Sequence, residues 1–271
     1  MNRADVDVFK NWFATYVAGF RTGDPVKDRT IALKEAHTRR VCKEIIMIAR
    51  SLELSPHDLI LAETIALFHD VGRFRQYREF GTFNDAASRN HAELGLEELA
   101  EHQVLNGCAA EERKRIRRAI RCHNVRVLSE ERDEQVVFFA RLVRDADKLD
   151  IWRVFVDYYE GRYSDVDSTV VWGLPDEQSC SSKITDALLA QEMADTKHMA
   201  TLNDFKLLQI SWIFDVNFIP TFCAVRRRRY IDKIAATLPR TDIVQKAVGR
   251  ANAYLLTCSA KEPDAGRNEH P

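Results

Sequence analysis

Residues 66–73 read ALFHDVGR and place a histidine beside an aspartate at the end of an apolar helical run. Burying an imidazole and a carboxylate is costly unless both groups are paired. A divalent cation can satisfy both side chains at once. The pair His69 and Asp70 therefore predicts a metal site, provided that His37, far upstream, and Asp147, far downstream, reach the same point.

Composition limits the classes of partner. The 271 residues are 45% hydrophobic, which is enough for one large domain, or for one domain with a helical appendage. The formal net charge of −1 predicts no attraction to a nucleic-acid polymer or an anionic membrane. Six cysteines without a CxxC pair predict free thiols in a reducing compartment. With no apolar leader and no long apolar run, a cytoplasmic location is expected.

Hydrophobic periodicity predicts an all-α fold. Helices are expected over residues 5–20, 28–52, 56–69, 91–105, 110–123, 134–158, 184–196, 201–217, 220–237 and 241–256. Gly72 suits a helix stop, and residues 73–90 are expected to form a long functional loop, rich in arginine and aromatic residues.

Three segments follow from this pattern. Residues 1–160 are expected to form a helical core, and residues 161–182 an irregular connection. Residues 183–258 should form a C-terminal helical extension that packs on the core. The polar tail, residues 259–271, is expected to be disordered.

Candidate ligands lie on the inner faces of separate helices. His37, His69 and His123 each share a face with apolar residues three or four positions away. In RDADKLD, residues 144–150, Asp147 continues an apolar face, with Asp150 one turn further on. Asp145 continues a more polar face and is the fallback. A lone inward histidine is more often a hydrogen-bonded core residue than a ligand, but several such groups together require cations.

These residues resemble the HD-domain superfamily of metal-dependent phosphohydrolases over about residues 28–160. The resemblance is carried by the order His37, His69-Asp70, Asp147 and by the stretches FHDVGRFRQY, TFNDAASRNHAELG and RDADKLD. They look most like bacterial HD proteins described only as predicted phosphohydrolases. The resemblance implies an HD-domain helical bundle, here with additional C-terminal helices.

The resemblance also implies ligands. One ion would be held by His37, His69, Asp70 and Asp147. His91 and His123 match extra histidines of a six-ligand branch, in which Asp70 would bridge two ions. Asn124 stands where many members carry a second adjacent histidine, which weakens the case for two ions. In members with one metal, the equivalent of His91 contacts the substrate phosphate or donates a proton.

The donor set restricts the metal. Imidazole and carboxylate ligands suit Mn²⁺, Fe²⁺, Co²⁺, Ni²⁺ or Zn²⁺, as one or two ions. The lack of thiolate ligands argues against a structural zinc site. Mg²⁺ is less favoured because it prefers oxygen ligands.

Further residues are candidates for work on a phosphate ester. Charge on the phosphate needs cationic groups, for which Arg73 is the first choice and Lys148 the second. The substrate-binding candidates are Arg73, Arg75, Arg78, Arg89 and Tyr77; the catalytic candidates are Asp70, Arg73, Asp85, His91 and Lys148. In the enzymes that this chain resembles, a loop acid positions the attacking water or protonates the leaving group, and Asp85 and Glu79 are the candidates for this role. The alternative for the charged residues is a solvated surface position, and the alternative for the aromatic residue is simple packing.

The expected function is hydrolysis of a small phosphate ester, with a mono-, tri- or cyclic dinucleotide as first choice. The alternative is an HD-type di-iron oxygenase acting on a polyol or phosphonate, and a third possibility is a non-catalytic regulatory module. A homodimer is a further expectation. The run Arg226–Arg229 is expected to be a solvated helix end or an interface contact, because consecutive helical residues point around the axis.

Overall fold

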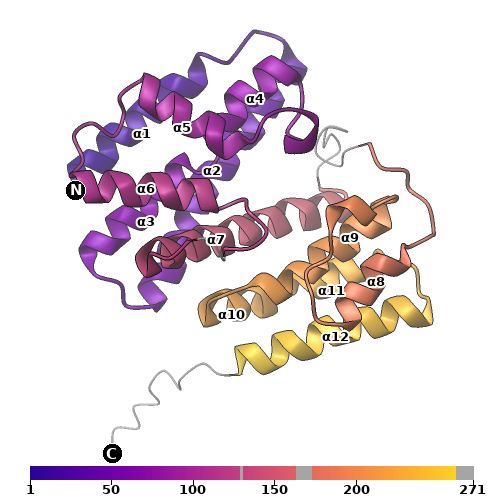
Figure 1. Ribbon diagram of the computed structural model, residues 1–271. Coiled ribbons are helices and arrows are strands. Elements are labelled where there is room, and N and C mark those ends of the chain that lie inside the picture. Colours follow the sequence, from indigo (N-terminus) through magenta and orange to yellow (C-terminus); the bar gives the residue numbers. More distant parts are fainter. Residues whose placement is uncertain (129–130, 163–172, 261–271) are drawn as a thin grey trace, which may run out of the picture. The chain divides into compact units, whose positions relative to one another are not determined.

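The computed structural model describes residues 1–128, 131–162 and 173–260 (Figure 1). These residues contain helices and no strand, so the all-α fold is confirmed. The α-helices are α1 (Arg3–Ala18), α2 (Pro25–Ser51), α3 (Pro56–Phe68), α4 (Gly72–Phe80), α5 (His91–Glu101), α6 (Ala110–Cys122), α7 (Glu134–Tyr159), α8 (Ser182–Leu189), α9 (Leu202–Ser211), α10 (Ile219–Arg228), α11 (Tyr230–Ala235) and α12 (Asp242–Ser259). None of the helices described here has the length and apolarity needed to cross a bilayer.

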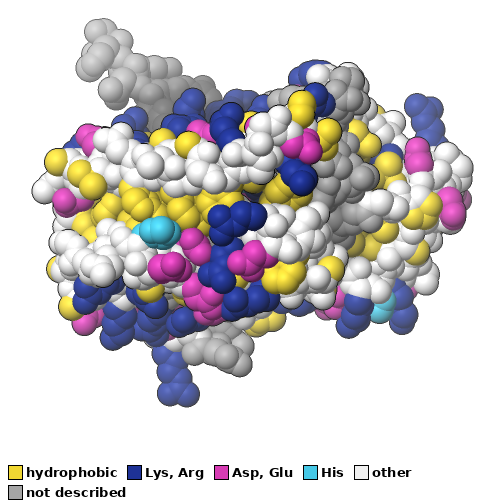
Figure 2. All heavy atoms as spheres, turned by 90° about the horizontal axis from the view of Figure 1, so that it is seen from above, with side chains coloured by type: hydrophobic (Ala, Val, Ile, Leu, Met, Phe, Trp, Pro, Cys, Tyr) yellow, Lys and Arg dark blue, Asp and Glu magenta, His cyan; other side chains and the backbone are white. Residues whose placement is uncertain are grey.

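The backbone divides into two compact units, one comprising Met1–Ile151 and the other beginning at Trp152. The predicted division into residues 1–160, 161–182 and 183–258 stays a prediction. Part of the predicted connection, residues 163–172, and most of the predicted tail, residues 261–271, lie outside the described residues. On the face drawn in Figure 2, side chains of both charge signs lie beside hydrophobic ones, in keeping with a net charge of −1.

Local capping sets the helices that carry the candidate site in the first unit. Asp24 caps α2 by accepting from two backbone N–H groups, and Ser55 with Pro56 begins α3 as the sequence predicts. The Asn90 side chain accepts hydrogen bonds from the first turn of α5 and so fixes His91 as its first helical residue.

The stretch after the His-Asp pair differs from the expected loop. Residues 72–80 form α4, and Asp85–Ala87 form a 3₁₀ turn. Gly72 is the first residue of α4 and not a helix stop. A Cβ atom on it would lie 2.1 Å from the carbonyl oxygen of His91 and 2.4 Å from the backbone nitrogen of Gly95. Glycine is therefore required by the close approach of α4 and α5, which periodicity does not report.

The second unit also departs from the expected helices. The single helix predicted over residues 220–237 is divided at Arg229, whose φ of 56° is left-handed and cannot continue a right-handed helix. In place of the helix predicted over residues 201–217, the α-helix α9 ends at Ser211 and is followed by a 3₁₀ turn, Trp212–Asp215. Within this unit the Trp152 indole donates to the carbonyl oxygen of Gln209 at 2.9 Å.

Candidate metal centre

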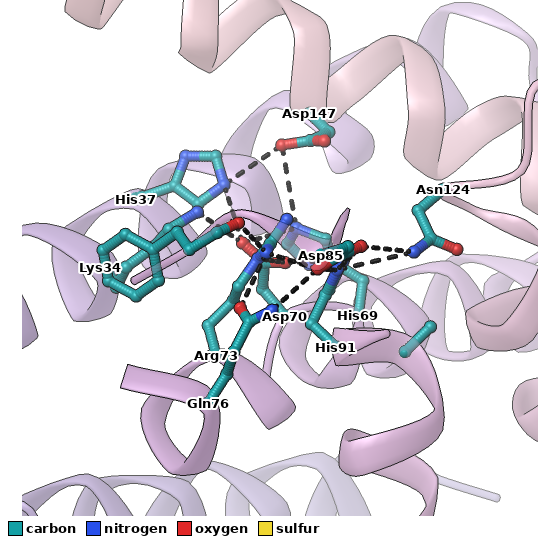
Figure 3. Close-up of polar contacts among 12 residues, drawn as sticks. Lys34, His37, His69, Asp70, Arg73, Gln76, Asp85, His91, Asn124 and Asp147 are labelled. Atoms are coloured by element: carbon teal, nitrogen blue, oxygen red, sulfur yellow. Dashed lines mark hydrogen bonds and ion pairs between the residues drawn. The ribbon is translucent and has the colours of Figure 1, made fainter. Parts of the chain in front are cut away.

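Four polar side chains from three separate stretches of the sequence meet inside the first unit (Figure 3). His37 comes from the middle of α2, His69 and Asp70 from the turn after α3, and Asp147 from α7. The Nε2 atom of His37 lies 3.0 Å from Asp147 Oδ1 and 3.5 Å from Asp70 Oδ2. His69 Nε2 lies 3.7 Å from the same Asp147 oxygen and 3.8 Å from the same Asp70 oxygen.

A second group shares Asp70 with the first. His91 Nε2 lies 3.3 Å from Asp70 Oδ1 and 2.9 Å from His123 Nε2. Candidate ligand atoms of Asp70, His91 and His123 all lie within 4.8 Å of one another, as do those of His37, His69 and Asp70. Asp70 therefore presents one carboxylate oxygen to each group, the arrangement that a bridging ligand requires.

The hydrogen-bond partner of each Nδ1 atom decides which nitrogen of the histidine carries the proton. Each Nδ1 atom lies 2.7 Å from an oxygen: His37 from Asp150 Oδ2, His69 from the Ala66 carbonyl, His91 from Asp85 Oδ2, and His123 from the Ile120 carbonyl. A backbone carbonyl or an ionised carboxylate only accepts, so each Nδ1 carries the hydrogen and donates it. In the neutral ring the Nε2 atom then offers a lone pair toward the cluster.

These lone pairs have no donor to satisfy them. Buried Nε2 atoms of His37 and His69, and Oδ1 of Asp147, make no hydrogen bond within the described chain. The Nε2 atoms of His91 and His123 face each other at 2.9 Å with both Nδ1 positions protonated. Unpaired buried acceptors destabilise a fold. A divalent cation would bind the lone pairs of all these atoms and so remove the cost. The residues present therefore fit a metal ion on the chemistry of the donor set.

The charges around Asp70 keep it ionised. Burial would raise the pKa of Asp70, but the charges of Lys34 and Arg73 hold it well below its usual range. The Nζ atom of Lys34 lies 2.8 Å from Asp70 Oδ2, and Arg73 Nε lies 3.3 Å from Oδ1. An ionised carboxylate is the form that binds a metal.

The pKa values of His91 and His123 are shifted in the opposite direction to that of His37. Burial and nearby His91 lower the pKa of His123 to about 3, and burial with Arg73 lowers that of His91. Both rings are thus neutral and able to coordinate. Burial and Lys34 would lower the pKa of His37, but the nearby carboxylates of Asp147 and Asp150 raise it. A positive species at His37 Nε2, whether proton or metal ion, is therefore favoured.

Asp85 anchors the side chains around His91. Its carboxylate accepts from Arg73 Nη1 at 2.9 Å, Gln76 Nε2 at 2.8 Å, His91 Nδ1 at 2.7 Å and Asn124 Nδ2 at 3.1 Å. Burial would raise the pKa of Asp85, but the hydrogen bond from His91 and the charge of Arg73 lower it. An ionised, multiply bonded carboxylate holds its donors in place and is a poor proton donor. Asn124 contributes to this network.

Three residues that contact the candidate ligands, or the carboxylates that orient them, were not predicted from the sequence. Lys34 lies one turn before His37 on α2, so helical spacing alone would have found it. Gln76, fully buried, donates to Asp85. The Arg40 Nε atom donates to Asp150 Oδ1 at 2.6 Å, so that Asp150 is ionised and orients His37. Arg40 also lies one turn from His37 on α2, but its role on Asp150, like that of Gln76 on Asp85, depends on a partner from another segment.

Three of the arginines expected to bind substrate, Arg75, Arg78 and Arg89, contact other residues of the first unit. Arg75 contacts Glu79, Glu97 and Glu98; Arg89 contacts Glu97; and the Arg78 guanidinium lies 4.5 Å from the Phe20 ring centroid. Tyr77 stacks on Phe83 with centroids 5.2 Å apart. Lys148 is buried, and so is Asp145, which corrects the expectation that Asp145 faces a polar side.

Comparison with known proteins identifies one family. The family model of the HD domain matches residues 35–152, a stretch that includes the whole candidate centre. No curated protein and no solved structure matches the chain. HD domains are typical of metal-dependent hydrolases, and the cluster described above can hold a metal ion. Residues 35–152 are thus an HD domain, and this part of the chain belongs to the HD-domain superfamily.

Proposed function

We propose that this chain is a metal-dependent phosphohydrolase that cleaves a small phosphate ester, with a nucleotide as the first candidate. The observation that carries the proposal is the combination of converging Nε2 lone pairs and carboxylates with two cations, Lys34 and Arg73, on the shared ligand Asp70. The donors suit a metal ion, and the cations suit an anionic substrate.

The ligands divide between two positions. His37, His69, Asp70 and Asp147 would hold one ion, and Asp70, His91 and His123 a second. A bound ion of this kind lowers the pKa of water and polarises a phosphoryl oxygen. Imidazole-rich donors favour Mn²⁺, Fe²⁺, Co²⁺, Ni²⁺ or Zn²⁺ over Mg²⁺.

The substrate phosphate would lie against Lys34 and Arg73. Three acceptors fix the Arg73 guanidinium, namely Gln76 Oε1 at 2.8 Å, the Phe83 carbonyl at 2.6 Å and Asp85 at 2.9 Å. A guanidinium held in this way needs little reorganisation to contact a phosphate. The buried Lys148 stays a second candidate.

A nucleotide is favoured by the aromatic pair next to Lys34. The Nζ atom of Lys34 lies 5.3 Å from the Phe83 ring centroid, and Phe83 stacks on Tyr77. Aromatic faces beside a phosphate-binding cation suit a base or sugar. His91, oriented by Asp85, would either bind the second ion or move a proton. The six free cysteines agree with the proposed cytoplasmic location.

Metal analysis followed by a phosphatase panel tests this proposal. We expect the purified protein to hold a transition metal and to release phosphate from a nucleotide with added Mn²⁺. His69→Ala and Asp70→Asn should each lower the rate by at least ~100-fold, because each removes a ligand. His198→Ala, a histidine of the second unit outside the cluster, is the matched control.

Two other results would replace the proposal. Iron that co-purifies, with O₂ uptake and no phosphate release, would establish the oxygenase alternative. A protein without bound metal and without activity in either assay would be a regulatory module.

A further inference from the structure

One face of α2 and one face of α3, with two side chains of α1, line a pocket of about 670 Å³ in the first unit. The lining on α2 extends from Arg39 to Arg50, and that on α3 from Pro56 to Leu67. Arg39 and Arg50 lie eleven residues apart on α2, so this wall is about 16 Å long. We call this site the seam pocket. None of its lining residues is a candidate metal ligand, so it is separate from the candidate metal centre.

The floor of the seam pocket is apolar. It is formed by Cys42 and Ile46, four residues apart on α2, and by Leu59, Ile60 and Leu67 on α3. Cys42 and Leu67 are buried, and the other three side chains are half-buried. Burial raises the pKa of the Cys42 thiol to about 12, so this side chain stays neutral and adds to the apolar surface. Covering such a floor with an apolar ligand removes it from water and is favourable.

Three cations in the lining already have acidic partners. The buried carboxylate of Glu63, the one acidic residue in the lining, pairs with both Arg3 and Lys10 of α1. Arg39 pairs with Glu35, one turn earlier on α2, at 2.9 Å. An anionic group of a ligand must therefore find its cation elsewhere in the lining.

Two lining cations differ from these three. The exposed side chains of Lys43 and Arg50 make no hydrogen bond or ion pair with any residue that the structure describes. Arg50 is the better match for a carboxylate, because its planar fork can donate two parallel hydrogen bonds. It also lies in the last turn of α2, where the pocket ends beside the turn into α3. A carboxylate bound there keeps part of its hydration while a chain attached to it covers the apolar floor.

We propose that the seam pocket binds one long-chain fatty acid, with its carboxylate on Arg50 and its acyl chain along the apolar floor toward Leu67. The volume lies within the range of about 300–1,000 Å³ typical of small-molecule sites. A linear chain matches a floor that follows two neighbouring helices, and each CH₂ group that it buries adds to the affinity. An anion without such a chain would leave the floor exposed to water. This site is distinct from the proposed hydrolytic centre and does not depend on it.

Calorimetric titration of the full-length chain with monomeric dodecanoate tests the proposal. EDTA in the buffer removes metal ions, so that binding of the carboxylate at the candidate metal centre does not contribute. We expect one dodecanoate per chain, bound about tenfold or more weakly by Arg50→Glu, because a donor is replaced with a repelling charge. Arg141→Glu is the matched control, an exposed arginine of α7 in the same unit that lies outside the pocket.

The acyl chain has its own tests. Decanoate and octanoate should bind successively more weakly, by about threefold to fourfold for each CH₂ group removed, and butyrate should show no binding. Leu59→Gln, which places an amide on the apolar floor, should weaken dodecanoate about fivefold or more. Leu54→Gln is its control, because Leu54 is also half-buried but lies outside the lining.

Three results would overturn the proposal. The first is that dodecanoate does not bind, or binds at several equivalent positions on each chain. The second is that a pocket variant and its control weaken binding equally. The third is that vesicles of an anionic phospholipid bind the chain through Arg50 while monomeric dodecanoate does not, which would make this face a membrane contact. Because the titration is done without metal, its failure would leave the phosphohydrolase proposal unaffected.

Discussion

At the scale of single residues, the candidate centre depends on how each histidine is oriented. The partners of the four Nδ1 atoms are two backbone carbonyls and two carboxylates, which fix the rings before any ion binds. Such preorganisation lowers the cost of assembling a metal site. The same principle applies to Arg73, which Asp85 and Gln76 hold beside Asp70.

Lys34 provides the sharpest test at this scale. Lys34→Met should lower kcat/KM for a phosphate ester by about tenfold to a hundredfold, because it removes a cation from the substrate side of Asp70. Bound metal, measured by elemental analysis, should be unchanged. Lys43→Met, an exposed lysine of the same helix, is the control. An unchanged kcat/KM would mean that Lys34 only neutralises Asp70.

At the scale of helices, close packing brings the two ligand groups together. The backbones of α4 and α5 approach at Gly72 and Gly95 more closely than a Cβ atom allows. His91 begins α5 at this contact, so the approach sets the distance between His91 and Asp70.

Gly72→Ala should therefore destabilise the protein by more than about 2 kcal/mol, because the added methyl meets backbone atoms that cannot move aside. Gly249→Ala lies in the exposed interior of α12, where nothing lies within 4 Å of a new Cβ atom. It should stabilise the protein by about 0.5–1 kcal/mol. Urea unfolding of both variants measures the difference, and a tolerated Gly72→Ala would contradict the close packing.

A second prediction concerns the contact of α1 with α3. The buried carboxylate of Glu63 on α3 pairs with Arg3 and Lys10 on α1. Burial would raise its pKa, but hydrogen bonds from Lys10 and Arg3 lower it below 4.5. A lowered pKa contributes stability above the unfolded value, and this stability is lost as the pH falls through the folded value.

Glu63→Gln should thus lower the free energy of unfolding by about 1–2 kcal/mol at pH 7. The difference from the native chain should shrink as the pH falls below 4.5 and vanish below the folded pKa. Urea unfolding of both proteins at steps of about one pH unit between pH 3 and pH 7 measures this difference in the free energy of unfolding. Glu101→Gln, an exposed residue at the end of α5, should show no such dependence.

At the scale of the whole molecule, the candidate metal centre belongs to the first of the two units. This unit holds a cluster of buried donors that suits a cation. Since α7 contributes residues to both units, the chain is continuous between them as a helix.

Removing metal should lower the melting temperature of the whole protein. A ligand at about 100 times its Kd stabilises by ~2.7 kcal/mol, which corresponds to a shift of at least about 5 °C. Scanning calorimetry with and without EDTA measures this shift. In Asp147→Asn, which loses a ligand oxygen, EDTA should have a much smaller effect. Equal melting temperatures of the native chain with and without EDTA would show that no metal stabilises the fold.

The sequence by itself determined the helical class and most helices of the first unit, because a period of 3.6 residues fixes which side of a helix is buried. The same periodicity selected His37, His69 and Asp147, whose side chains meet in the structure. It failed for Asp145, since α7 is buried around much of its circumference at this depth.

Only the tertiary structure decided the rest. The close approach of α4 to α5 and the place of Lys34 on Asp70 each depend on contacts between separate segments of the chain. Spacing along a helix encodes the direction of a side chain and not the partner that it meets. For that reason the candidate ligands were visible in the sequence, whereas the contacts through which other groups orient and charge them were not.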